Sequence, residues 1–166
     1  MKPWQRSLAS CYVLLLFSSC DPSSRPPAEV SPPADFEIRW GSGATHAEWG
    51  REEGTLNAKG ELIWVKSRGY GQNASREEAR GQASPEQILG VWRAINESRF
   101  FDLRKSYDNA AVQDGFSEFI AVTADGLNHS VSVLNTSQPR FSQVMKALNE
   151  LMLSVVPSAP TKDDAP

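Results

Sequence analysis

The stretch FSEFIAVTADGLNHSVSVL, residues 116–134, decides the fold. Apolar and polar residues alternate on both sides of Asp125 and Gly126, which is the pattern of two half-buried strands. Asp-Gly suits a type I′ turn, the turn that joins adjacent antiparallel strands. The stretch therefore predicts a β-hairpin. His129 shares the parity of the apolar Val131, so it is expected at the wet end of the apolar face, in a structural role.

Helical patterns flank this hairpin. After it, QPRFSQVMKALNELML carries apolar residues at helical spacing from about Pro139 onward. Before it, SPEQ at 84–87 combines a serine cap, a proline at the first helical position and a glutamine that closes a capping box. The apolar residues that follow lie on one helical face up to about Ser98. Two amphipathic helices are therefore expected.

The remaining strands come from shorter patterns. FEIRW at 36–40 alternates, and TLNAKGELIWVK at 55–66 follows the pattern of two strands joined by a turn at 58–60. Residues 67–83 are rich in glycine and charge without a period, and they predict a long surface loop. The order of strands, helix, hairpin and helix predicts an α+β domain, with two helices packed on one face of an antiparallel sheet.

The N-terminal residues 1–19 have the layout of a secretory signal peptide. A basic start is followed by an apolar run and then by Ser18 and Ser19. As a helix, residues 8–19 would extend about 18 Å, against about 30 Å for the hydrocarbon core of a bilayer. The run is therefore too short to span a membrane.

The segment FSSC at 17–20 resembles the lipobox of bacterial lipoprotein signals, with Phe17 where leucine is usual. The resemblance implies cleavage before Cys20 and attachment of acyl chains, palmitate among them, to that cysteine. Several chains make such an anchor effectively permanent. The expected location is the bacterial cell envelope or periplasm, membrane-anchored outside the cytoplasm, with the inner and outer membranes both open. The alternatives are a disulfide with Cys11 and a soluble secreted chain with a free thiol at Cys20.

Composition divides the rest of the chain into three parts. The lipidated cysteine and a proline-rich tether occupy 20–35, a single domain occupies 36–156, and a disordered tail occupies 157–166. Removal of residues 1–19 takes away two basic and no acidic residues, which shifts the formal net charge from −3 to −5. An acidic chain of this kind lacks the electrostatic footprint of a nucleic-acid-binding protein.

No strong catalytic or metal-binding motif is present in the sequence. His46 would need a carboxylate such as Glu48 or Asp114 beside it to act as a base or a ligand, and a solvated loop histidine is the commoner case. The chain is therefore not expected to be an enzyme, and no cofactor or metal is expected. A scattered acid–base site around His46 and Asp114 stays as the enzymatic alternative.

Recognition of a partner protein is the function that the sequence favours. Trp64 and Trp92 fall in periodic elements and are expected in the core, whereas Trp49 lies in a glycine-flanked loop. Trp49 and Tyr70 are the candidate partner-binding residues, on loops predicted at 41–53 and 67–83.

The stretch at 98–141 runs from a helix end through FFDL to a hairpin, and its distinctive positions are Phe100, Phe101, Leu103, Asp114, Gly115, Phe116, Gly126, His129, Val131 and Pro139. In these positions it is similar to small bacterial domains that are frequent in lipoproteins and mostly lack an assigned function, and the resemblance covers about Phe36 to Leu153. One branch of these domains looks like emfourin, an inhibitor of thermolysin-type metalloproteases. The resemblance implies the fold more than an activity. It leaves an inhibitor and a structural envelope protein as alternatives to a recognition module.

Overall fold

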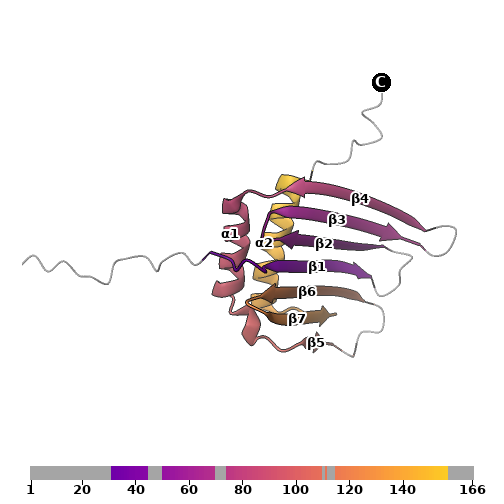
Figure 1. Ribbon diagram of the computed structural model, residues 1–166. Coiled ribbons are helices and arrows are strands. Elements are labelled where there is room, and N and C mark those ends of the chain that lie inside the picture. The colour runs from indigo at the N-terminus through magenta and orange to yellow at the C-terminus, as the bar shows by residue number, and fades with distance from the viewer. Residues whose placement is uncertain (1–30, 45–49, 70–73, 110, 112–114, 157–166) are drawn as a thin grey trace, which may run out of the picture. The chain divides into compact units, whose positions relative to one another are not determined.

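The computed structural model describes residues 31–44, 50–69, 74–109, 111 and 115–156. They form one seven-stranded sheet in the order β4-β3-β2-β1-β6-β7-β5 with two α-helices (Figure 1). All strand pairs are antiparallel except β5 with β7. The predicted α+β fold is confirmed. Its elements are β1 (Glu37–Ala44), β2 (Arg51–Asn57), β3 (Glu61–Arg68), β4 (Ser75–Gln82), α1 (Pro85–Glu97), β5 (Ser106–Asp108), β6 (Phe116–Ala124), β7 (Leu127–Leu134) and α2 (Pro139–Val155).

The predicted hairpin is present as β6 and β7. Asp125 and Gly126 both have positive φ, 52° and 73°, as a type I′ turn requires at its two central positions. The predicted turn at 58–60 also joins β2 to β3, where the Gly60 N–H donates to the Asn57 carbonyl at 2.9 Å. His129 packs edge-on against Phe100 with ring centroids 5.6 Å apart. This contact places the His129 ring against the core.

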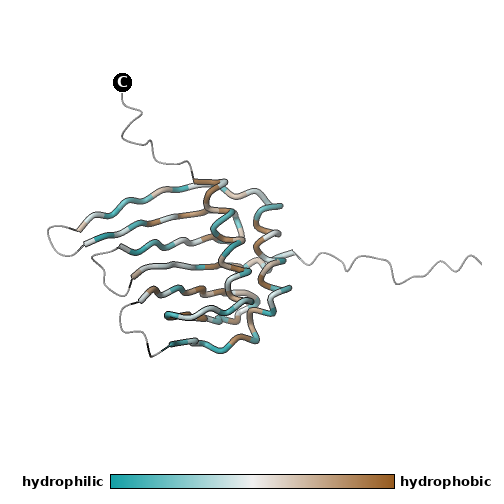
Figure 2. The backbone as a smooth tube through the Cα atoms, turned by 180° about the vertical axis from the view of Figure 1, so that it is seen from behind, coloured by the Kyte–Doolittle hydropathy of each residue, from teal (hydrophilic) through white to brown (hydrophobic). Residues whose placement is uncertain are grey.

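Both helices begin where the sequence placed them. Ser84 caps α1, and Gln87 completes the capping box. The side chains that α1 and α2 bury join one core with those from a single face of the sheet. Trp92 belongs to this core, as expected, whereas Trp64 is only half-buried and packs against the core. Figure 2 shows the hydrophobic residues recurring in both helices and in the central strands, whereas β4 is mostly hydrophilic.

A short 3-10 helix, Phe100–Asp102, closes the core beyond the end of α1. Phe100 and Leu103 are 0% and 4% exposed, so the aromatic stretch fills the space between the helices and the sheet. Arg140, in the first turn of α2, donates to the backbone carbonyls of Ser98 and Arg99. This side chain satisfies carbonyls that the end of α1 leaves without helical partners.

The prediction of a surface loop at 67–83 was wrong over most of its length. Residues 75–82 form β4, the edge strand of the sheet, and β3 continues to Arg68. The predicted loop at 41–53 is likewise shorter, because β1 extends to Ala44 and β2 begins at Arg51. The side chains of an edge strand are exposed on both faces of the sheet. Such a strand therefore lacks the alternation of apolar and polar residues by which strands are predicted from sequence.

Asp35, placed by the sequence at the end of the tether, binds the hairpin turn. Its carboxylate accepts the backbone N–H groups of Gly126 at 2.7 Å and Asp125 at 2.9 Å. These hydrogen bonds, from Gly126 first and Asp125 second, lower the pKa of the Asp35 carboxyl below its ordinary value of 3.8. The chain that leads into β1 is thereby held against the β6–β7 turn.

Replacement of Asp35 by asparagine is expected to lower the melting temperature at neutral pH. The folded-state pKa is depressed, so the stabilisation is fully present above the unfolded value and is lost as pH falls through the folded pKa. The difference between the wild type and Asp35→Asn should therefore shrink in acid below about pH 4. Thermal unfolding followed by circular dichroism, once at neutral pH and once below about pH 4, measures this difference in melting temperature. Asp108→Asn, at an exposed position of β5, is the control, and an equal change in both variants would contradict the role of Asp35.

Candidate functional site

The two ends of the sheet differ in what they carry. At one end lie the turns between β2 and β3 and between β6 and β7, together with Asp35, where the described chain leads into the sheet. At the other end, here called the distal end, the pairs Gly43–Arg51, Ala44–Phe116 and Arg68–Ser75 close the ladders. Figures 1 and 2 show both helices toward the turn end, with the strands extending beyond them to the distal end.

The candidate residues from the sequence lie outside the described residues. Trp49, Tyr70, His46, Asp114 and Cys20 all fall in such segments. Of the described residues, Gly50 follows Trp49, Gly69 precedes Tyr70 and Gly115 follows Asp114 in the chain, and all three adjoin strand ends at the distal end of the sheet. The described chain neighbours of three of the candidates therefore lie at one end of the sheet.

A hollow of about 500 Å³ opens at the distal end. Lys66 pairs with Glu52 at 3.2 Å within it, and the Phe116 side chain at its rim is 54% exposed. Its walls therefore combine an aromatic ring with charged groups of both signs. The lining residues are Ser42, Gly43, Ala44, Gly50, Arg51, Glu52, Lys66, Arg68 and Phe116.

A second hollow, of about 330 Å³, lies between α2 and β6 and is here called the α2 groove. Glu118 of β6 lines it, and residues of α2 form the rest of its wall. Glu118 is the register partner of Ser42, which lines the distal hollow, so the two hollows adjoin across β1 and β6. The α2 residues that line the groove are Ser142, Met145, Lys146, Asn149, Glu150 and Leu153.

Glu118 is the unusual group of the α2 groove. Its side chain shares the face of β6 that carries the buried Ile120 and Val122, and it is half-buried. Burial raises the pKa of the Glu118 carboxyl above its ordinary value. Within the described part of the chain, it has no ion-pair or hydrogen-bond partner. A half-buried carboxylate without a partner is costly, which makes it a candidate for a functional group.

Sequence reasoning missed Glu118, although a signal was present. In FSEFIAV the positions 116, 118, 120 and 122 share one strand parity, and the apolar residues of that set define the core face. An acidic residue at a core parity position conflicts with the pattern of its strand. A conflict of this kind, between the residue type and the apolar pattern of its strand face, is typical of sites where function outweighs stability.

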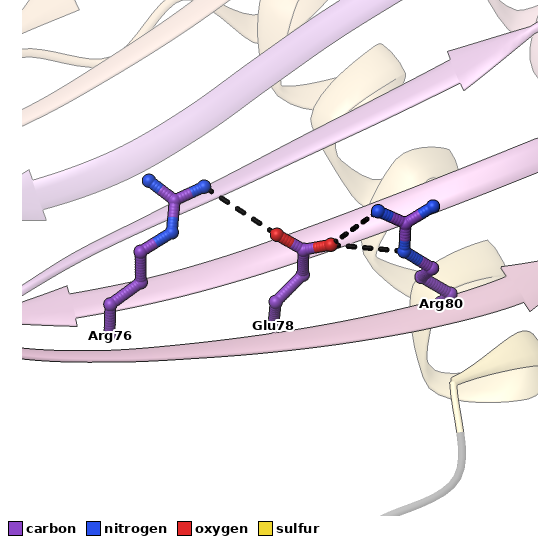
Figure 3. A network of polar contacts seen from close by, with 3 residues as sticks. All are labelled: Arg76, Glu78 and Arg80. Carbon is purple, nitrogen blue, oxygen red and sulfur yellow. Dashed lines mark hydrogen bonds and ion pairs between the residues drawn. The ribbon is translucent and has the colours of Figure 1, made fainter.

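The opposite face of the sheet carries charges at its edge. On β4, Glu78 pairs with Arg80 at 2.8 Å and with Arg76 at 3.6 Å (Figure 3). The guanidinium of Arg80, ahead of that of Arg76, lowers the pKa of the Glu78 carboxyl. Charged side chains on an edge strand oppose pairing with the strands of other molecules. These charges therefore protect the β4 edge against the addition of a further strand.

Among the described residues, no three histidine, cysteine, aspartate or glutamate side chains gather in a way that would hold a metal ion. No helix in the same part of the chain has the length and apolar character needed to cross a membrane.

No family model matches the chain, and no curated protein sequence matches it. Most of the described residues by which the chain resembles small lipoprotein domains stabilise the fold. Phe100 and Val131 are fully buried, Gly126 forms the hairpin turn and Pro139 begins α2. A side chain at Gly115 would collide with that of Asn135.

Proposed function

We propose that the chain is a lipid-anchored protein of the bacterial cell envelope whose α+β domain recognises another protein. The FSSC segment at 17–20, after a short apolar run and before a proline-rich stretch, carries the proposal of an anchor. The adjoining hollows of the domain, with an exposed aromatic residue and a carboxylate that has no ion-pair or hydrogen-bond partner among the described residues, support recognition.

The arrangement of the two ends of the sheet suits this function. The described chain leads into β1 at the turn end of the sheet, and β1 then runs eight residues to the distal end, about 25 Å at ~3.3 Å per residue. The distal hollow therefore lies at the end of the sheet opposite to the end at which the described chain enters it.

Replacement of Cys20 by serine is expected to abolish lipidation. Expression in bacteria with labelled palmitate should give labelled wild-type protein that fractionates with membranes. Cys20→Ser should be unlabelled, because its hydroxyl lacks the nucleophilicity of a thiolate. Cys11→Ser is the matched control and should keep the label, since Cys11 precedes the expected cleavage site. Labelled Cys20→Ser protein, or wild type without label, would contradict the anchor.

The recognition function is tested with the full chain in detergent as bait against an extract of its own cell envelope. A stoichiometric partner is the expected result, and its identity separates the alternatives. Inhibition of a thermolysin-type protease at a one-to-one ratio would favour the inhibitor. An envelope polymer or scaffold as the bound component would favour the structural protein. A folded bait that retains nothing would contradict recognition.

A further inference from the structure

We propose that the α2 groove binds a segment of the partner protein that places a lysine or arginine against Glu118 and an apolar side chain against Leu153 or Phe116. The inference rests on the proposed recognition function and names the chemistry of the partner. It is carried by the charges and the exposed apolar side chains of the groove and of the adjoining distal hollow.

The charges around Glu118 leave it without a cation. Lys146 of α2 lies in the same groove but pairs with Glu150 at 3.8 Å. Lys66 of β3, in the adjoining hollow, pairs with Glu52 at 3.2 Å. The carboxylate of Glu118 has thus lost part of its hydration without gaining an ion pair among the described residues. A cation from a partner restores the missing interaction, and charge complementarity of this kind selects partners.

Exposed apolar side chains adjoin this carboxylate. Leu153 of α2 is 73% exposed and Phe116 of β6 is 54% exposed, and they are two of the three large hydrophobic side chains that stand out on the described surface. Leu153 lines the α2 groove together with Glu118, and Phe116 lies two residues from Glu118 on the same strand face. A basic residue with apolar neighbours complements this combination, with the apolar contacts excluding water from the ion pair.

The partial burial of Glu118 has a consequence that a measurement of stability can detect. Its folded-state pKa is raised above the unfolded value, so the folded state gains relative stability when the group is protonated and loses it as pH rises through the folded pKa. At neutral pH, Glu118→Gln is therefore expected to melt at a higher temperature than the wild type. The difference should narrow as pH falls toward the ordinary range of glutamate.

The binding test uses the full chain and defined peptide probes. Short capped peptides of alternating serine and apolar residues carry a central lysine, arginine or norleucine, and their affinities are measured by fluorescence anisotropy. The wild type should bind the lysine or the arginine peptide at least about tenfold more tightly than the norleucine peptide. Glu118→Gln should reduce this ratio to about one while it keeps the fold. Glu37→Gln, at an exposed position on the opposite sheet face, should keep the full ratio.

A second variant tests the apolar part of the groove. Leu153→Ser should weaken the binding of all three peptides by a similar factor, because it removes apolar contact without touching the charge. Equal binding of basic and norleucine peptides by the wild type, or an unchanged ratio in Glu118→Gln, would overturn the inference. If Glu118→Gln still retains the envelope partner as the wild type does, the recognition function stands and this assignment of the groove falls.

Discussion

Replacement of Phe100 by alanine is expected to lower the free energy of unfolding by about 3–5 kcal/mol, the usual cost of removing a buried aromatic ring. Phe100 is 0% exposed. It packs edge-on against Phe101 and His129, with ring centroids 6.1 Å and 5.6 Å away. These two neighbours come from the same 3-10 helix and from β7, so they would close only part of the cavity. Denaturant-induced unfolding followed by circular dichroism measures the loss.

Phe116 provides the matched control for this prediction. It is the same residue type but 54% exposed at the start of β6. Phe116→Ala should change the free energy of unfolding by no more than about 0.5 kcal/mol, as is usual for a surface substitution. If the two variants lost similar stability, the short 3-10 helix would not be closing the core.

Gly54→Ala is expected to destabilise the domain by about 1–3 kcal/mol, the typical cost of overpacking a core. Gly54 is the register partner of Trp40 in the centre of the sheet. A Cβ atom at residue 54 would collide with the six-membered ring of the Trp40 indole. Because Trp40 is 1% exposed, its ring has little room to move away. The free energy of unfolding from denaturant titration tests this expectation.

Gly90 is the control glycine. It lies on the exposed side of α1, and a Cβ atom there would have no neighbour within 4 Å. Gly90→Ala should raise the free energy of unfolding by about 0.5–1 kcal/mol, because alanine loses less conformational entropy in a helix than glycine does. Opposite signs for the two Gly→Ala substitutions are the expected result. A loss of stability in both would point to a general intolerance of the variants instead of the Trp40 contact.

The elements that sequence reasoning found are those with strong local signals. The α1 capping box, the Asp125–Gly126 turn and the proline at the start of α2 each fix their element within a few residues. The sequence analysis did not predict β4 and β5, because neither strand has a strong local sequence signal. β4 is charged on an edge, and β5 has only three residues, whose pairing with β7 depends on the path of the intervening chain. Tertiary context decides such strands.

The candidate site was only partly within reach of the sequence. Aromatic residues in glycine-rich segments directed attention to Trp49 and Tyr70, whose neighbours Gly50 and Gly69 adjoin the distal end. The α2 groove needs two elements that are distant in the chain, β6 and α2, and their packing is a property of the folded domain. The sequence alone indicates only that Glu118 lies on the same strand face as the apolar Ile120 and Val122.

The sheet is assembled from two parts of the chain that meet along one seam. β1 to β4 follow one another as neighbours, β6 and β7 form a local hairpin, and the two groups are joined by the pairing of β1 with β6. That seam aligns Glu37 with Thr123 and so closes a loop of about 86 residues. The loss of chain entropy in this closure costs about 4 kcal/mol of free energy, in addition to a constant that does not depend on the loop length. Formation of the β1–β6 seam, rather than of either local unit, is therefore expected to limit the folding rate.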